Sequence, residues 1–515
     1  MRLKKFNQII KHKKKNALRP TFHLLEDRYS DIYDWEVSES QILEVMSELE
    51  KYGYNLDYLT IMNVLKGNYA RGNVKLAVEF LIYLSEANEL IVHEIEPSIE
   101  LLGSENLNGV TCYLDALLFA MFAKTNCFEA MLFQEGKDPV STKLCTFIRL
   151  WVNMLRDGRL ITKDIVSQLC DVLIECGWKS ASKTQQDASE VYVFITEKLN
   201  FPLLTFKVVI AHGGKFNSEE DNKYIHERLL CVPIPGDFLS YETPISLEDC
   251  LSEYFNNKIK VKRCVEQSFS AESSKKGSQK YLYNRNIIDN DKNYYEQLDE
   301  FYDNDIATLY PQRDLSLVSA WQFFQLLPFY VYKQPDNLNQ HFLEKLPIVT
   351  ICLKRYTWTV TGEAYCNNRR VLIPLVLDLP YFISHEEVSS NNSIEIKKYR
   401  LVLQSVVCHR NAGFTIDSGH YIAFSRDSFS KKWFLFDDLA YQKVSVFCDP
   451  SEVLNSEMPY MLFYQLESYI PNLSQEIPKI DAFKSSDDIQ DFSTFSKPSK
   501  RFNETKYSEK NCLIQ

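Results

Sequence analysis

The sequence predicts an α+β protein in which helices dominate the first half of the chain and strands the second. Segments with apolar residues at helical spacing lie at 38–90, 106–123 and 184–199. Runs rich in β-branched and aromatic residues follow between 346 and 436. Because the helical and strand segments are segregated along the chain, the pattern is typical of the α+β class.

The composition indicates a large globular chain. Its 515 residues are 45% hydrophobic and 13% aromatic, which is enough to build an extensive core and excludes disorder throughout. The net charge of −11 opposes binding to the phosphates of duplex nucleic acid, so no nucleic-acid partner is expected. Thirteen cysteines without a Cys-x-x-Cys pair, and no apolar leader, indicate free thiols in the cytoplasm or nucleus and no zinc ribbon.

Both ends of the chain are predicted to be flexible tails. Residues 1–36 carry a basic run around Lys11, which is typical of a solvated tail, a nuclear import signal or a segment attracted to anionic lipid. Residues 468–515 are rich in Ser, Lys and Asp. A third polar segment, 265–312, has neither helical nor strand periodicity and is interpreted as an insertion inside a larger domain.

Residues 38–90 are predicted to form three short helices. The apolar pattern follows Ser38, stops near Gly53-Tyr54 and starts for the third time after Asn73, a suitable N-cap. Helix, Gly-aromatic loop, helix and Gly-Asn turn resemble a ubiquitin-associated domain, a family that presents this loop and its third helix to ubiquitin. The resemblance implies ubiquitin binding and a partly exposed Tyr54, whereas the alternative is a small helical packing module.

Cys112 is the candidate nucleophile. The tight-turn dipeptide Asn108-Gly109 precedes it, and an amphipathic helix containing Leu114 and Leu117 follows. Cys112 is therefore predicted to begin a buried helix, whose positive end would lower the pKa of the thiol and favour the nucleophilic thiolate. The alternative is a small hydrophobic residue in a core, the usual place of a free cysteine.

A thiol nucleophile needs a base and an orienting group, and the segment 417–444 offers both. His420 precedes an alternating run that is typical of a strand beginning at this residue. A turn through 426–432 leads to a second predicted strand, which ends immediately before Asp437. This hairpin is expected to set Asp437 beside His420, where a carboxylate would fix the imidazole tautomer.

Two carboxylates at the start of the predicted helix 184–199 form a third candidate site. Asp187 and Glu190 have the spacing of an N-cap and a capping box, so a structural role explains both. The functional alternative is that these carboxylates face a substrate that carries basic residues.

Four segments resemble, in order, the motifs of the ubiquitin-specific protease family. They are GVTCYLDALLF as its Cys box, QQDASEVYVFI as its Gln-Gln-Asp helix, LPIVTICLKRY as the strand before the active-site sheet, and VVCHRNAGFTIDSGHYIAFSRD with KKWFLFDD as its His box. Their order and spacing fit that family from about residue 100 to 467. The run that follows Cys112 is nearest to the cylindromatosis-type branch of the family.

The resemblance implies a papain-like cysteine protease fold with thumb, palm and fingers, preceded by the helical module. It implies a thiol-dependent deubiquitinase that hydrolyses the isopeptide or peptide bond after the C-terminal glycine of ubiquitin. Cys112, His420 and Asp437 would be its catalytic residues, without a cofactor. Asp187 and Glu190 occupy places where the family binds the basic tail of ubiquitin.

Two departures from the family pattern bear on activity. The family places an oxyanion-hole Asn five residues before the nucleophile, where this chain has Leu107, so Asn108 or the backbone amides at Cys112 are the candidate donors. Losing one such donor typically lowers turnover about 10²–10³-fold. A non-catalytic or weakly active ubiquitin-binding adaptor is therefore the alternative function. The zinc-binding cysteines of the family's fingers are also missing, which predicts a fingers region that is zinc-free or reduced in size.

The last four residues, Cys512-Leu513-Ile514-Gln515, match the C-a-a-X pattern, in which Gln at the last position favours farnesyl. Basic residues between 497 and 510 precede them. A lipid on Cys512, assisted by this basic segment, would hold the protein weakly on a cytoplasmic membrane face. The alternative is a chance cysteine near the end of the chain.

Overall fold

The structure is a computed structural model that describes residues 35–212, 217–235, 243–264, 315–331, 346–358, 364–379, 382–384, 386–390, 393–410 and 418–469. The predicted N-terminal tail as far as residue 34, the insertion 265–312, the C-terminal tail beyond residue 469 and Cys512 lie outside the described residues. Among the helices that the structure describes, none combines the length and apolarity needed to cross a bilayer.

The three helices predicted for residues 38–90 are confirmed. They are α2 (Glu39–Lys51), α3 (Tyr58–Lys66) and α4 (Val74–Asn88). Ser38 and Gln41 form a capping box at the start of α2, and the Asn73 side chain accepts two backbone N–H groups of the first turn of α4. Apolar residues from all three helices, including Val45, Ile61 and Leu81, close a small core.

The expectation that Tyr54 would be partly exposed is wrong, because its side chain is only 8% exposed. Gly53 adopts φ +80°, and this turn lets the Tyr54 N–H reach the carbonyl of Leu49 while the ring enters the helical core. Burial, together with the nearby Glu89 and Glu86 of α4, raises the pKa of the Tyr54 phenol above its usual range. The aromatic residue of this loop therefore holds the module together.

The helices expected to form a thumb are grouped around α5. They are α5 (Cys112–Phe122), η2 (Glu129–Leu132), α6 (Pro139–Arg156), α7 (Lys163–Glu175) and α8 (Ala188–Lys198). Every residue of α5 is buried, so this helix is the centre of the domain. Arg156 of α6 is itself buried and donates to the carbonyl of Phe122, which satisfies the C-terminal end of α5.

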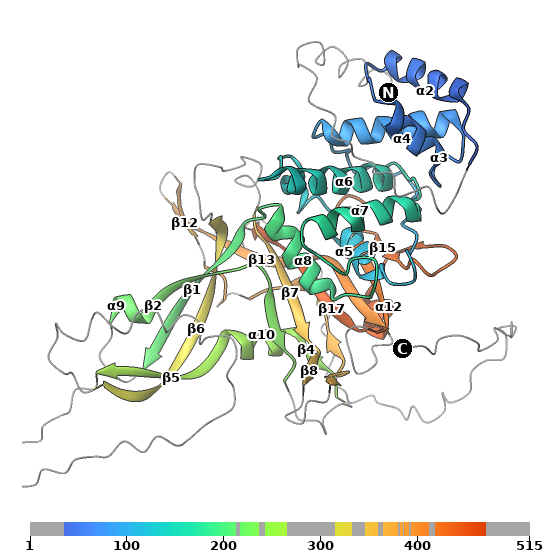
Figure 1. Ribbon diagram of the computed structural model, residues 1–515. Coiled ribbons are helices and arrows are strands. Elements are labelled where there is room, and N and C mark those ends of the chain that lie inside the picture. Colours follow the sequence, from blue (N-terminus) through green and yellow to red (C-terminus); the bar gives the residue numbers. More distant parts are fainter. Residues whose placement is uncertain are drawn as a thin grey trace, which may run out of the picture. The chain divides into compact units, whose positions relative to one another are not determined.

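The palm is a nine-stranded sheet within the described residues, and its main path runs β16-β15-β14-β13-β17-β7-β3. Its strands are β3 (Leu230–Pro233), β7 (Ile348–Lys354), β11 (Val376–Leu377), β12 (Glu386–Ser390), β13 (Ser393–Arg410), β14 (His420–Arg426), β15 (Trp433–Phe436), β16 (Val444–Phe447) and β17 (Pro459–Tyr469). Helix α5 packs on β13 and β14 (Figure 1). The first residue of α5 is thereby brought to the strand that begins at His420.

Short elements flank this sheet. They are β4 (Ile245–Ser246), α10 (Leu247–Phe255), β8 (Tyr356–Trp358), β9 (Ala364–Cys366), β10 (Val371–Leu372) and α12 (Ser451–Ser456). Buried Arg355 follows β7 and donates to three backbone carbonyls, those of Pro459, Asn367 and Arg369. These bonds join the end of β7 to the beginning of β17 and to the segment between β9 and β10.

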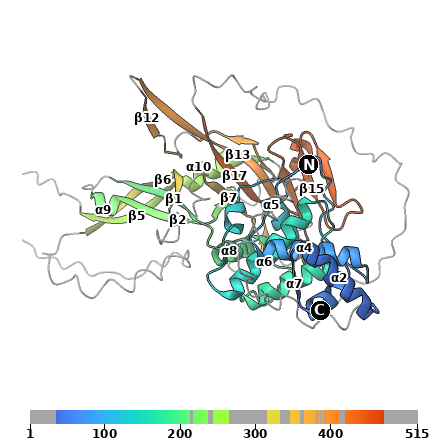
Figure 2. The same cartoon turned by 90° about the horizontal axis from the view of Figure 1, so that it is seen from above.

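The fingers are a separate four-stranded sheet with the order β2-β1-β6-β5. Its strands are β1 (Leu203–His212), β2 (Asn222–Glu227), β5 (Asn256–Cys264) and β6 (Leu315–Val331), and the short helix α9 (Ser218–Asp221) precedes β2. Figure 2 shows these strands extending away from the thumb helices. Near the α9 end of this sheet, the buried side chains of His212 and Asp221 pair at 3.0 Å.

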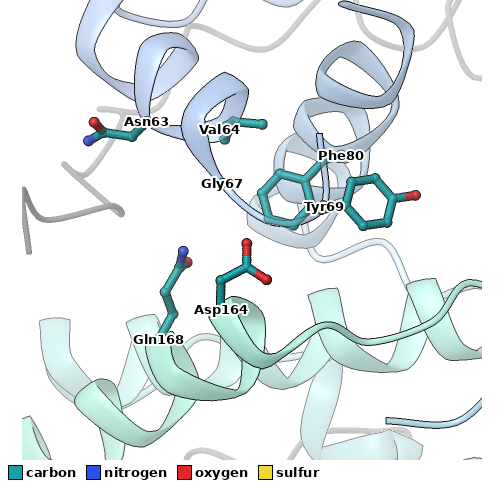
Figure 3. A pocket seen from close by; sticks show the side chains of 7 residues that line it. All are labelled: Asn63, Val64, Gly67, Tyr69, Phe80, Asp164 and Gln168. Carbon is teal, nitrogen blue, oxygen red and sulfur yellow. The ribbon is translucent and has the colours of Figure 1, made fainter. Parts of the chain in front are cut away.

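The helical module and the thumb share one compact unit. Helix α4 packs on α6, and the buried Arg149 guanidinium of α6 donates to the carbonyl of Ala87 at 2.6 Å. A second contact joins the loop after α3 to α7, where Gly67 and Tyr69 face Asp164 (Figure 3). This contact encloses a cavity of only about 10 Å³, so the two surfaces fit closely.

Candidate active site

Cys112 is the first residue of α5, as predicted, and its side chain is 1% exposed. The expected lowering of its thiol pKa is not found. Burial raises the pKa of Cys112 to about 12, and the neighbouring carboxyls Asp438 and Asp115 add to this effect, although a backbone hydrogen bond from Tyr421 opposes it. A helix N-terminus favours a thiolate, but here desolvation and two carboxyls outweigh it, so the resting side chain is a thiol.

The predicted hairpin of His420 and Asp437 is also present. Strand β14 begins at His420, β15 ends at Phe436, and the two strands pair antiparallel. The Nε2 atom of His420 lies 2.8 Å from Oδ1 of Asp437, which also accepts the backbone N–H of Leu439 at 3.1 Å. This carboxylate fixes the tautomer of His420 and leaves the Nδ1 atom of the ring for a proton from another group.

Arg410 is a residue of this site that the sequence reasoning missed. It is the cross-strand partner of His420 in the β13–β14 ladder, and its guanidinium donates to Oδ2 of Asp437 at 2.6 Å. It also binds both carboxylate oxygens of Glu457. Burial alone would raise the pKa of Asp437, but the bond and charge of His420, the Leu439 amide and Arg410 together lower it to about 2.

A second carboxyl, Asp438, lies against the same imidazole. Its Oδ1 atom is 3.6 Å from Nε2 of His420, and the residue is buried. Burial raises the pKa of Asp438 to about 6, while His420, Lys443 and the Asn106 side chain act in the opposite direction. Within the described residues, His420, Asp437 and Asp438 are the one set of three side chains spaced closely enough to hold a cation, but Arg410 already supplies positive charge there.

A second histidine, His409 of β13, is the cross-strand partner of Tyr421 in β14. The His409 ring stacks on Tyr421 with centroids 4.2 Å apart, and its Nδ1 atom bonds the Tyr356 hydroxyl. Burial lowers the pKa of His409 to about 4, and the charge of His420 lowers it further, against a backbone hydrogen bond at Ser418. This stacked pair joins the end of β13 to the start of β14 without adding a charge.

The two asparagines near Cys112 lie in different environments. Asn108 is exposed and adopts φ +55°, a left-handed conformation that Asn tolerates well, so it serves the turn before α5. Asn106 is buried, and its Oδ1 atom accepts the backbone N–H of Thr111 at 3.2 Å. Because the Oδ1 atom is occupied by Thr111, the amide nitrogen of Asn106 points away from that backbone N–H. No pattern in the sequence distinguishes Asn106 from Asn108.

Asp187 and Glu190 also differ in their environments: Asp187 is held by hydrogen bonds, and Glu190 is exposed. Asp187 is the N-cap of α8, and its carboxylate accepts the Ser189 N–H at 2.7 Å and the Tyr460 hydroxyl at 2.9 Å. Burial raises the pKa of Asp187 despite these bonds. Glu190 is exposed on the first turn of the same helix. The structural role predicted for Asp187 is therefore present, and Glu190 is the more accessible carboxylate.

Comparison with solved structures gives remote matches. The chain is similar to one in the structure of the SAGA Ubp8/Sgf11/Sus1/Sgf73 DUB module bound to ubiquitin aldehyde, with 17% identity and a TM-score of 0.46, over 79% of this chain and 77% of that one. A monoubiquitin-bound form of the module gives a TM-score of 0.45, and a structure of the yeast module gives 0.44, each at 17% identity. These two matches cover 79% of this chain and 77% and 76% of the other chains.

The match to a protein family is direct and long. The model of the ubiquitin carboxyl-terminal hydrolase family matches residues 102–464, which extend from before the thumb helix α5 into the last palm strand β17. This range contains Cys112, His420 and Asp437, and it contains both sheets described above except the last residues of β17. The protein therefore has the papain-like fold of the ubiquitin-specific proteases and is a cysteine-type deubiquitinase. The chain belongs to the ubiquitin carboxyl-terminal hydrolase family.

Proposed function

We propose that Cys112, His420 and Asp437 are the catalytic residues of this deubiquitinase. The observation that supports this assignment is the 2.8 Å bond between His420 and Asp437 beside the buried start of α5. The backbone hydrogen bond between Cys112 and Tyr421 ties the thiol to the residue that follows His420. Nucleophile, base and orienting carboxylate are thus carried by one helix and one hairpin.

In the proposed reaction the Cys112 thiol transfers its proton to His420, and the thiolate attacks the carbonyl carbon of the last glycine of ubiquitin. The imidazolium then protonates the leaving lysine or α-amine, which leaves a thioester on Cys112. His420 next removes a proton from water, and the hydroxide releases ubiquitin and restores the thiol. Asp437 keeps its negative charge throughout and stabilises each imidazolium.

Reaction with ubiquitin propargylamide tests this assignment. Wild-type protein is expected to form a covalent adduct, and Cys112→Ala is expected to abolish it. Cys127→Ala is the matched control, because this half-buried thiol lies in the loop after the same helix. Folded wild-type protein that binds ubiquitin without forming the adduct would instead favour the weakly active or non-catalytic adaptor. The raised thiol pKa and Leu107 are the observations on which that second candidate rests.

Two side chains are candidates for the oxyanion donor that Leu107 does not supply. Asn106 and Asn108 are each one residue from the family position, and Asn108 is exposed in the turn. Asn106 is buried beside Thr111, and its side chain also lies close enough to Asp438 to lower the pKa of that carboxyl. These contacts hold the Asn106 amide rigidly near the start of α5, so we favour Asn106 and retain Asn108 as the alternative.

For substrate binding, we infer that Glu190, with Asp187 behind it, receives the basic tail of ubiquitin. Glu190 is exposed at the first turn of α8, whereas Asp187 is held by Tyr460 and Ser189. An exposed carboxylate at the first turn of a helix is accessible to an arginine that approaches from solvent. This inference depends on the family resemblance of the Gln-Gln-Asp helix.

We also retain the proposals that the module 38–90 is ubiquitin-associated and that the protease is nearest to the cylindromatosis-type branch. The order of helices and loops supports the first, but α4 packs on α6 and Tyr54 is buried, so only part of such a surface is accessible. Leu59, 49% exposed, is an accessible apolar side chain near the Gly-aromatic loop in sequence, at the start of α3, the second helix of the module. In a Cys112→Ala background, Leu59→Arg is expected to weaken ubiquitin binding; unchanged titrations would identify a packing module.

Membrane attachment through a farnesyl group on Cys512 is a further proposal, which rests on the terminal sequence alone. It would place the enzyme on a cytoplasmic membrane face, with the nucleus as the alternative location. Cys512→Ser is expected to release the protein from membranes without changing its activity on soluble ubiquitin conjugates. An unmodified C-terminal peptide in mass spectra of protein from its native cells would refute the anchor.

A further inference from the structure

A buried carboxyl that the proposed reaction does not use lies one helical turn after the nucleophile. Asp115 follows Cys112 by three residues in α5, so the two side chains share a face of the helix, with Cβ atoms about 5–6 Å apart. Asp115 is 1% exposed. The surrounding positions of α5 are apolar, and an acidic residue at the centre of a domain core needs a physical reason.

The hydrogen bonds around Asp115 are too few for a carboxylate. Ser104 donates its hydroxyl to Oδ1 at 2.6 Å, while Oδ2 has no partner of ordinary geometry among the described residues. A buried carboxylate normally requires two or three donors, whereas a carboxylic acid is satisfied by fewer. Burial, increased by the charge of Asp438, raises the pKa of Asp115 to about 8, although Ser104, Thr111 and Lys443 act against it.

Asp115 and Asp438 are the two carboxyls whose charges act on the Cys112 thiol. Both carboxyls raise the pKa of Cys112 when they are ionised. Asp438 has the stronger reason to ionise, because His420 is 3.6 Å away and becomes an imidazolium when it takes the thiol proton. Asp115 has no such cation beside it, so the proton of this pair stays on Asp115.

The other titratable groups near Asp115 do not change this order. Cys170 of α7 and Tyr113 of α5 are buried and neutral, since burial raises the pKa of each side chain. The ammonium of Lys443 is bound to the carbonyl of Asp438 and favours both ionised carboxyls. Asp115 is thus the one group in this set whose charge can change in mildly alkaline solution and oppose the thiolate.

We propose that Asp115 is a proton-holding positioning residue: its neutral carboxylic acid permits the Cys112 thiolate to form beside His420, and its ionisation suppresses that thiolate in alkaline solution. The proton leaves Asp115 for solvent and is not transferred to substrate, so no step of hydrolysis passes through this residue. The inference rests on the proposed role of Cys112 as nucleophile. The proposal predicts that activity falls at alkaline pH because Asp115 ionises, an effect that Cys112, His420 and Asp437 alone would not produce.

The test compares the pH profiles of wild type and Asp115→Asn, whose amide has the same shape and cannot ionise. Two rates are measured from pH 6 to 10: kcat/KM on a fluorogenic ubiquitin substrate, and alkylation of Cys112 by iodoacetamide. The ratio of variant to wild type is expected to be near one at pH 6.5 and to reach about tenfold at pH 9.5, equivalent to one pKa unit on the thiol. Asp138→Asn, at the exposed N-cap of α6, is the charge-matched control with a flat ratio.

Ser104→Ala provides a second variant if the amide perturbs folding. Without the hydroxyl that favours the charged form, Asp115 should keep its proton to higher pH, and the alkaline limb should move upward. Superimposable profiles for wild type and either folded variant would overturn the proposal, as would a ratio that is constant with pH. Loss of the ubiquitin adduct in Cys112→Ala, measured in parallel, establishes the nucleophile independently of Asp115.

Discussion

Arg410 and Asp437 are joined by a 2.6 Å charge-assisted hydrogen bond, although 27 residues separate them in the chain. The bond exists because the β13–β14 ladder places Arg410 directly opposite His420, the other partner of Asp437. The Asp437 carboxylate therefore lies between the guanidinium of Arg410, which is always charged, and the imidazole of His420, which becomes charged when it takes a proton. Glu457 binds the remaining face of the guanidinium, which leaves Arg410 little freedom to move.

Arg410→Ala is expected to lower kcat on a fluorogenic ubiquitin substrate by about tenfold, with KM nearly unchanged. The physical reason is that Asp437 loses one of two fixed partners and His420 is oriented less well. Arg400→Ala, on the same strand and paired with Glu467 at 3.3 Å, is the matched control and should retain activity. Equal kcat values for the two variants would remove Arg410 from the site.

The oxyanion donor is tested by a pair of asparagine variants. If the Asn106 amide binds the oxyanion, Asn106→Ala should lower kcat about 10²-fold with little change in ubiquitin affinity. Asn108→Gly should leave kcat unchanged, because glycine readily adopts the left-handed φ of +55° at this turn. The reverse result would assign the donor to Asn108. Full activity in both would leave the backbone amides at Cys112.

His93 predicts a pH-dependent contribution to stability. Its Nε2 atom lies 3.0 Å from Glu86 of α4, and its Nδ1 atom lies 3.2 Å from Asp157, the C-cap of α6. Burial opposes the charged form, but bonds to the two carboxylates raise the pKa of His93 from 6.5 to about 9. Because the folded pKa is the higher one, the stabilisation is complete below pH 6.5 and is lost as pH rises through 9.

His93→Gln is therefore expected to destabilise the fold by up to roughly 3 kcal/mol near pH 6 and much less near pH 10. Urea unfolding at the two pH values measures the difference. His226→Gln, at an exposed position of β2, is the matched control, measured at the same two pH values. A His93 variant whose loss of stability is the same at both pH values would show that packing, and not charge, explains the contact.

The two candidate substrate-binding carboxylates, Asp187 and Glu190, should differ in the effect of their substitution. Glu190→Gln is expected to raise KM for ubiquitin substrates several-fold at low salt with kcat unchanged, because an exposed carboxylate acts by screened attraction. Asp187→Asn should chiefly lower the melting temperature, since Tyr460 then donates to a weaker acceptor. If Glu190→Gln leaves KM unchanged in low salt, this residue does not bind the basic tail.

The sequence predicted those parts of the site that depend on short-range patterns. Periodicity and turn residues placed Cys112 at the start of a buried helix, and alternation placed His420 at the start of a strand. The hairpin to Asp437 required only a turn of a few residues. These features are local, so propensity and capping decide them before any long-range packing forms.

The sequence could not predict features that depend on register or on depth of burial. Arg410 lies opposite His420 because of the register between β13 and β14, and the identities of the two residues do not predict that register. The thiol pKa of Cys112 was expected to fall because a helix terminus is visible in the sequence, whereas desolvation by distant strands is not. Tyr54 was misjudged for the same reason, because its burial depends on the packing of α4.

The contact between α4 and α6 determines how far the protein can be truncated from its N-terminus and still fold stably. A fragment that begins at residue 100, where the family resemblance begins, would leave the buried Arg149 without the carbonyl of Ala87 and Asn153 without that of Ile91. The fragment would also lose the packing of α4 on α6, and each lost hydrogen bond is worth about 0.5–1.5 kcal/mol, or more for the charged Arg149. The smallest stable recombinant enzyme should therefore start before α2. Substitutions in the helical module should lower the amount of folded protein and leave the reaction at Cys112 unchanged in each folded molecule.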